Sequence, residues 1–280
     1  MAGYRKKRER ELKSQIGHVE TVKKIEAVGK KLEGKGRTIL IVLIAVAVVA
    51  AGALFLFRRS ARKADEARAA MGAALKIQDA KVSATPEPGS TDPTYPTEKE
   101  RAEKAIVAFQ DVANRFGEPY HTNALYFIAV NRLVTERPKG LSELDGLTKN
   151  GDVSIATLAK YALAQAKEAD GDLAGAGALY ADLVKVNNPL VSADTANIAL
   201  ANVLNKQGKK QEASDILFKI ASDGRVAKDA EGLPKQPTGT SRAAADKLQK
   251  IDPDRYAQLP PEPPPPGGPM GGPGGGLPIG

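Results

Sequence analysis

Residues 161–184 read YALAQAKEADGDLAGAGALYADLV, and residues 199–220 read ALANVLNKQGKKQEASDILFKI. The two stretches align at an offset of 37 residues, which brings Gly171 over Gly208. The aligned positions on either side of this glycine are mostly small or apolar: Leu163 with Leu200, Ala164 with Ala201, Ala176 with Ala213, Leu179 with Ile216, Tyr180 with Leu217 and Leu183 with Ile220. Self-similarity at a fixed period of this length is typical of proteins built from stacked helix pairs.

An earlier copy of the pattern begins at Ala105, which is followed four residues later by Phe109. Ala105 lies 71 residues before Ala176, close to two repeat lengths. These residues resemble the tetratricopeptide repeat, in which the first helix carries Leu and a small residue, the turn carries Gly, and the second helix carries a small residue and then an aromatic one. The resemblance departs at the aromatic position of the first helix, where this chain has Lys167 and Leu204, and the chain contains no Trp.

The pattern predicts an all-α body over residues 60–252, a tetratricopeptide-like α-solenoid of about four helix pairs. The expected pairs are 60–82 with 98–116, 120–136 with 140–149, 153–169 with 173–186, and 192–206 with 210–222, followed by a capping helix at 239–251. A single pair cannot bury its apolar face alone, so the pairs are expected to stack and to form a concave groove. A generic stack of α-hairpins is the alternative.

Ahead of this body, residues 38–57 read TILIVLIAVAVVAAGALFLF, without a charged residue. About twenty helical residues span about 30 Å, the thickness of a bilayer core, so the sequence predicts a single N-terminal transmembrane helix that acts as an uncleaved signal-anchor. A buried core helix is disfavoured because nothing else in the chain could surround it. A cleaved signal peptide is disfavoured because its apolar region usually has about 7–15 residues and ends in small residues, whereas this stretch ends in Phe57.

The chain has 280 residues and a net charge of +8, and this charge is concentrated near the N-terminus. Residues 1–37 carry 12 Lys or Arg against 5 Asp or Glu, while the rest carries 29 against 28. We therefore interpret residues 1–37 as a basic cytoplasmic arm, with the body on the other side of the membrane. The local count of Lys and Arg is tied across the span. The arm has a helical apolar spacing, which is compatible with binding to anionic lipid or a partner, or with a solvated tail.

The composition excludes several kinds of site. The chain has no Cys, which excludes disulfides and thiolate zinc sites, and its two histidines, His18 and His121, are too few for a histidine metal cage. Phosphate-binding GxxxxGK[ST], nucleophile GxSxG and zinc-binding HExxH motifs are missing. We therefore expect a non-enzyme with no catalytic residue, no metal, no cofactor and no small-molecule substrate. The nearly neutral body also argues against nucleic acid as a partner.

The layout of arm, anchor and body, together with the two stretches quoted above, resembles the YfgM family of bacterial inner-membrane proteins over about residues 20–225. The resemblance implies an ancillary subunit of the SecYEG translocon that assists newly exported proteins in the periplasm. The implied partners are translocon subunits, periplasmic chaperones and exported client chains, with membrane lipid around the anchor. The implied location is the bacterial inner membrane, single-pass, with the N-terminus cytoplasmic and the C-terminal domain periplasmic.

Matching the repeat places five first-helix side chains on the concave face: Tyr126, Tyr161, Gln165, Asn202 and Asn205. A tyrosine offers apolar area with a hydroxyl, and Asn or Gln can pair with an extended peptide backbone, so these residues predict a peptide-binding surface. The alternative for Tyr126 and Tyr161 is that both are packed between helices.

Two other functions remain open from the sequence. The first is a structural scaffold or adaptor in cell-envelope assembly or cell division, whose groove holds one stable partner. The second is a regulator that sequesters a cytoplasmic factor through the basic arm. Residues 253–280 are rich in Pro and Gly and are predicted to be disordered, with a Pro-rich ligand for a partner as the alternative to a solvated tail.

Overall fold

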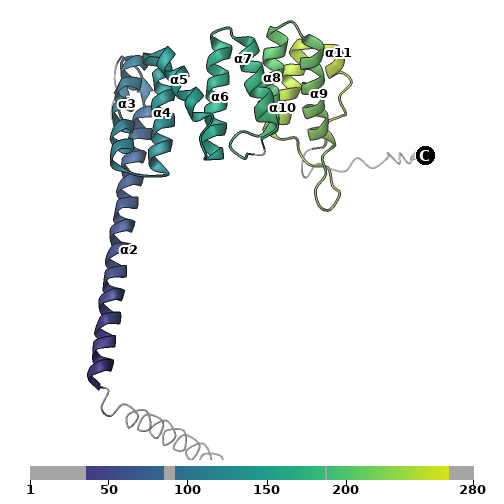
Figure 1. The fold of residues 1–280 in the computed structure, drawn as a ribbon. Helices are drawn as coiled ribbons and strands as arrows, with labels where there is room; N and C mark the ends of the chain where they lie inside the picture. The colour runs from purple at the N-terminus through teal and green to yellow at the C-terminus, as the bar shows by residue number, and fades with distance from the viewer. Residues whose placement is uncertain (1–35, 85–91, 187, 265–280) are drawn as a thin grey trace, which may run out of the picture. The chain divides into compact units, whose positions relative to one another are not determined.

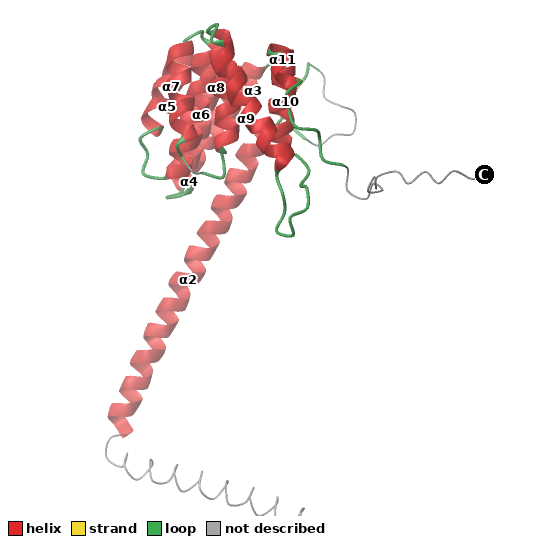
Figure 2. Ribbon diagram, turned by 90° about the vertical axis from the view of Figure 1, so that its right-hand side faces the viewer, coloured by secondary structure: helices red, strands yellow, loops and turns green. Residues whose placement is uncertain are grey.

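The computed structural model describes residues 36–84, 92–186 and 188–264, with side chains from residue 45 onward. Most of the predicted arm and residues 265–280 of the predicted tail lie outside these ranges. The chain divides into two units, Met1–Glu66 and Ala67–Gly280. Within the described residues the secondary structure is almost wholly helical (Figure 2), which confirms the predicted all-α fold.

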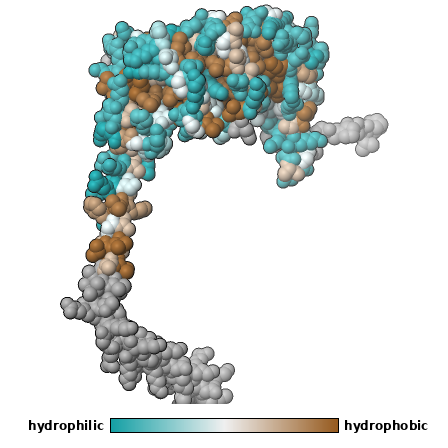
Figure 3. All heavy atoms as spheres, viewed as in Figure 1, coloured by the Kyte–Doolittle hydropathy of each residue, from teal (hydrophilic) through white to brown (hydrophobic). Residues whose placement is uncertain are grey.

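The described part of the first unit is helical throughout, and it belongs to α2 (Gly36–Gln78), whose last turns form part of the second unit. Large apolar side chains are exposed along residues 46–57 of this helix (Figure 3), at 52–73% of their surface. Among the described residues, no helix has an apolar stretch long enough to cross a bilayer. The side chains of residues 38–44, which begin the predicted span, lie outside the described set.

The second unit is a succession of helices (Figure 1), in which each helix from α3 onward packs against the next one along the chain. Among the described residues, further contacts join alternate helices: α4 with α6, α8 with α10 and α9 with α11. The bounds are α3 (Glu98–Arg115), α4 (Tyr120–Thr135), α5 (Arg137–Leu147), α6 (Val153–Ala169), α7 (Leu173–Val184), α8 (Ala193–Lys206), α9 (Lys210–Val226), α10 (Gly239–Ile251) and α11 (Pro253–Tyr256).

Three local features differ from the expectation. Helix α5 begins at Arg137 instead of residue 140, because Pro138 suits a first helical turn, where its missing N–H is not needed. The helix expected at 60–82 ends at Gln78. Two short strands follow, β1 (Lys81–Val82) and β2 (Thr94–Tyr95), which pair in parallel, and β2 lies inside the connection expected at 83–97. The short helix α11 lies in a segment for which we predicted disorder.

The core of the second unit repeats one packing unit in alternate helices. Each of α3, α5, α7 and α9 buries a small residue and, four positions later, a large one that is at most 1% exposed. The four pairs are Ala105 with Phe109, Gly140 with Leu144, Ala176 with Tyr180, and Ala213 with Leu217. The small residue lets the neighbouring helix approach closely while the large one fills the space between helices. The repeat at Gly140 was not recognised in the sequence.

The turns that end α6 and α8 are also alike. Gly171 and Gly208, which align at the 37-residue offset, have backbone φ angles of 83° and 80°. This left-handed conformation is strained for residues with a Cβ atom, and glycine adopts it readily at helix C-termini. The offset seen in the sequence therefore corresponds to a repeated turn geometry.

Residues 259–264, the C-terminal strap, lie against the end of α9 and the connection that follows it. Leu259 is buried in the core formed with α9 and α10. Arg225 donates hydrogen bonds to the carbonyl oxygen of Pro260, at 2.8 Å, and to Glu262, at 3.0 Å. Gln236 donates to the carbonyl oxygen of Pro264 at 2.7 Å. These residues belong to the predicted disordered tail, but their carbonyl groups have fixed partners in the structure.

Asp252 joins α9 to the start of α11, and it provides a test of stability against pH. It accepts hydrogen bonds from the Ser214 hydroxyl at 2.6 Å and from the Arg255 backbone N–H at 3.1 Å. These bonds, the Ser214 one first, lower the pKa of Asp252. Since the folded pKa lies below the unfolded value of about 3.9, this carboxylate stabilises the fold above that pH and ceases to do so as the pH falls through the folded pKa.

We expect Asp252→Asn to lower the melting temperature of the full-length chain at pH 6, and we expect this difference from the wild type to shrink below about pH 4. Thermal unfolding in detergent, followed by circular dichroism between pH 6 and pH 2.5, measures both values. Asp254→Asn, two residues away at an exposed position, is the matched control and should show a smaller difference. If the melting temperature of Asp252→Asn stayed below the wild-type value by a constant amount down to pH 2.5, the stabilising role of the Asp252 carboxylate would be contradicted.

Candidate peptide-binding surface

The five side chains predicted to bind peptide lie on three helices of the second unit. Tyr126 is on α4, Tyr161 and Gln165 are on α6, and Asn202 and Asn205 are on α8. Gln165 and Asn205 are exposed, while Asn202 is half-buried. Residues three or four positions apart lie on one face of a helix, so each of α6 and α8 presents its pair together.

An ion pair connects the polar faces of α6 and α8. Lys206 donates from Nζ to Oε1 of Glu168 at 2.7 Å. Glu168 lies one turn beyond Gln165 on α6, and Lys206 lies one turn beyond Asn202 on α8, directly after Asn205. We call these five residues, Gln165, Glu168, Asn202, Asn205 and Lys206, the α6–α8 polar surface.

The amide groups of this surface are free to bind. Within the described residues, the side chains of Gln165, Asn202 and Asn205 make no hydrogen bond, whereas other amides of the second unit do. An amide side chain offers two N–H donors and one carbonyl acceptor, the complement of a peptide group. The three amides can therefore pair with an extended backbone without breaking a contact inside the protein.

Glu168 is held in place by the core below it. Its side chain is 17% exposed, and its second carboxylate oxygen accepts a hydrogen bond from the Tyr180 hydroxyl at 3.2 Å. Burial first, and then the negative charge of Glu168, raise the pKa of Tyr180 well above its ordinary value. Tyr180 therefore stays protonated and serves as a fixed donor to Glu168, which in turn positions Lys206.

The two predicted tyrosines pack mainly into the core. Tyr126 meets Phe127 edge-on at 5.3 Å between ring centroids, and burial raises its pKa. Tyr161 meets Tyr180 edge-on at 5.9 Å. Both rings are half-buried among apolar residues, which agrees with the alternative that they are packed between helices. No hydrogen bond or ring contact between described residues connects Tyr126 to the α6–α8 polar surface.

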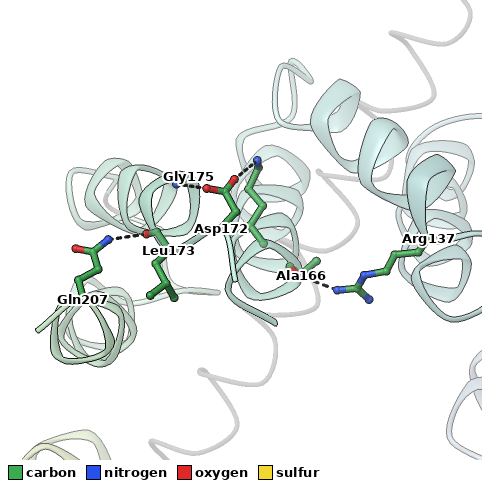
Figure 4. Close-up of polar contacts among 7 residues, drawn as sticks. Arg137, Ala166, Asp172, Leu173, Gly175 and Gln207 are labelled. Atoms are coloured by element: carbon green, nitrogen blue, oxygen red, sulfur yellow. Dashed lines mark hydrogen bonds and ion pairs between the residues drawn. The ribbon is translucent and has the colours of Figure 1, made fainter. Parts of the chain in front are cut away.

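Polar contacts at the helix ends keep α5 to α8 in register (Figure 4). Arg137 at the start of α5 donates to the carbonyl oxygen of Ala166 in α6 at 3.0 Å. Asp172 caps the start of α7. Gln207 after α8 donates to the carbonyl oxygen of Leu173 in α7 at 2.9 Å. The first of these bonds ties α5 to α6 and the last ties α7 to the end of α8.

A second feature is a cleft of about 390 Å³ between α3, α4 and α5. Its lining is largely apolar, with Leu125 and Ile128 from α4, and the paired side chains of Arg132 and Glu143 contribute charge. His121 donates from Nδ1 to the carbonyl oxygen of Ala113 in α3 at 2.8 Å. The cleft could accept one apolar side chain, and its histidine is already engaged by the backbone.

Glu168 and Lys206 were missed in the sequence because they are 38 residues apart and meet only once α6 and α8 are packed. A signal was present in the sequence. Each of the two aligned repeats has a charged residue near the end of its first helix, and the two charges have opposite signs. Compared with known proteins, the chain matches no protein family, no curated protein and no solved structure.

Proposed function

We propose that this chain is a membrane-anchored protein-binding module of the bacterial inner membrane, ancillary to the SecYEG translocon, which assists newly exported proteins in the periplasm. The observation that carries the binding function is the set of three amides on the α6–α8 polar surface that have no partner among the described residues, beside the Glu168–Lys206 ion pair. The proposal extends to the finer architecture, a tetratricopeptide-like α-solenoid. The buried small-and-large pair that recurs in four helices supports that architecture.

The proposed anchor is the predicted span at 38–57. In its described part, from residue 45, the helix exposes apolar side chains in consecutive positions, Leu54 to Phe57 among them. A helix that is apolar on all sides is typical of a lipid environment, whereas one that docks on a single partner needs only one apolar stripe. Residues 38–44 read TILIVLI, which would extend the apolar segment to about the thickness of a bilayer core.

The assignment to the translocon rests on the layout of arm, anchor and body and on the stretches 161–184 and 199–220. A binding surface made of amides, with one ion pair, suits extended chains of many sequences. Backbone pairing does not depend on the side chains of the bound chain, so such a surface would tolerate varied clients. The periplasmic chaperones would then receive or deliver the same chains.

The test places a photo-crosslinking amino acid at Gln165 or Asn205 of the full-length protein in bacterial cells. The expected products are translocon subunits and newly exported chains. Lys219, exposed on α9 and paired with Asp223, is the control position and should give neither. A single non-translocon partner at both positions would favour the scaffold instead, and products no different from those at Lys219 would refute the binding surface.

The anchor is tested separately. Membranes that contain the full-length chain are washed at alkaline pH, and the chain is expected to stay with the lipid. Deletion of residues 38–57 should release it. A wild-type chain found in the wash would refute the anchor without bearing on the α6–α8 polar surface.

A further inference from the structure

The helix α2 carries a face of positive charge directly after the apolar residues. Arg58, Arg59, Arg62 and Lys63 are all exposed. At 100° per residue their Cα atoms fall within an arc of about 140°, in two rows of residues four apart. They line a hollow of about 420 Å³ on the side of the helix, together with Phe55 and Glu66. We call these four cations the α2 cation face.

No acidic side chain among the described residues pairs with the α2 cation face. None of its four cations has an ion pair or a side-chain hydrogen bond within the described residues, although such pairs are frequent on α3 to α9. Glu66 at the end of the hollow is its single carboxylate. The face therefore has a net positive charge available to an external anion, and Phe55 provides an apolar surface beside it.

The position along the helix defines the kind of anion. Arg58 follows Phe57, the last residue of the proposed anchor, and the helix rises about 1.5 Å per residue. The four cations thus lie about 2–9 Å beyond the apolar segment. A headgroup layer is about 5–8 Å thick on each side of the bilayer core, and long Arg and Lys side chains can bend toward it. Lipid phosphates occupy this depth.

We propose that the α2 cation face binds anionic phospholipid headgroups, with Phe55 against the glycerol and the first part of the acyl chains. This inference rests on the proposed membrane anchor. An arginine guanidinium binds two phosphate oxygens at once, and the two rows of cations can clamp one phosphate between them. A zwitterionic lipid carries an ammonium group that offsets its phosphate, so a face with net positive charge favours a lipid of net negative charge. Because the cations occupy one side, the bound lipid also fixes the rotation of α2 about its axis.

The test uses the full-length chain in mild detergent, titrated with phosphatidylglycerol or with phosphatidylcholine of the same acyl chains. Native mass spectrometry counts the lipids retained. We expect phosphatidylglycerol to be retained at lower concentration than phosphatidylcholine. In the variant R58Q/R59Q/R62Q/K63Q, the apparent affinity for phosphatidylglycerol should fall at least about tenfold, to the level of phosphatidylcholine.

The matched control removes the same charge elsewhere, as K149Q/K185Q/K219Q/K250Q at exposed positions of the second unit, and should keep the preference. Added inorganic phosphate should not displace the lipid, because it has no acyl chains to contact the helix. Equal retention of both lipids by the wild type, loss of the preference in the control variant, or displacement by phosphate would overturn the inference. The alkaline wash distinguishes these outcomes from failure of the anchor, which would overturn both.

Discussion

Gly140→Ala is expected to lower the free energy of unfolding of the helical domain by about 3 kcal/mol, at the upper end of the range for overpacking a core. A Cβ atom at this position would lie 2.7 Å from the Leu133 nitrogen and 2.9 Å from both the Ala129 oxygen and the Arg132 carbonyl carbon. All three are backbone atoms of α4, which a side-chain rotation cannot move away. The helices α4 and α5 would have to separate, and the packing of Leu144 beside them would be lost.

The matched control is Gly146→Ala in the same helix. A Cβ atom there meets nothing within 4 Å, and alanine is favoured over glycine in a helix by about 0.5–1 kcal/mol, so this variant should be as stable as the wild type or slightly more stable. Thermal unfolding of the full-length chain in detergent should show the Gly140→Ala midpoint about 6–12 °C below the wild type. Equal midpoints for the two variants would contradict the close approach of α5 to α4.

Tyr180→Ala is expected to lower the free energy of unfolding by about 3–5 kcal/mol, the range for removing a buried aromatic ring. The ring is 1% exposed and lies in the core shared by α6, α7 and α8. Its removal leaves a cavity beside Leu183 and Val203 and also takes away the edge-on contact with Tyr161. Denaturant unfolding of the full-length chain measures the loss.

Tyr180→Phe separates the ring from the hydroxyl. This variant keeps the packing and removes only the hydrogen bond to Glu168, so it should cost about 1–2 kcal/mol. Glu168 would retain Lys206 as its partner, and crosslinking at Gln165 should weaken without disappearing. If Tyr180→Ala proved no more damaging than Tyr180→Phe, the ring would not be a core element, and the description of α7 would be wrong.

The sequence predicted the all-α fold and the approximate positions of the helices because their apolar spacing and the glycine turns are local signals. The pair of Gly140 and Leu144 escaped recognition since a glycine in place of alanine leaves no apolar residue to mark the pattern. The C-terminal strap was missed for a different reason. Its composition is typical of disorder, and its partners Arg225 and Gln236 lie 35 and 28 residues away from the bonded prolines.

Of the candidate binding surface, the sequence predicted the three amides from the repeat alignment. It could not predict the ion pair between Glu168 and Lys206, which depends on how α6 and α8 pack. The peptide-binding role of all five predicted residues stays a prediction, and so do the anchor at 38–57 and the partners. The half-buried setting of Tyr126 and Tyr161 shows why periodicity alone is a weak guide for tyrosine, whose ring packs in a core as readily as it contacts a ligand.

Helices of the second unit contact neighbours that are one or two helices away along the chain. This has a consequence for how the domain folds. Contacts that are close in sequence need little loop closure, so the domain should fold quickly and could begin before its C-terminal part has been delivered. A chain that crosses a membrane as an unfolded thread, as the proposed location requires, would gain order progressively on arrival. Such a domain would spend little time as an exposed intermediate in a compartment full of other nascent polypeptides.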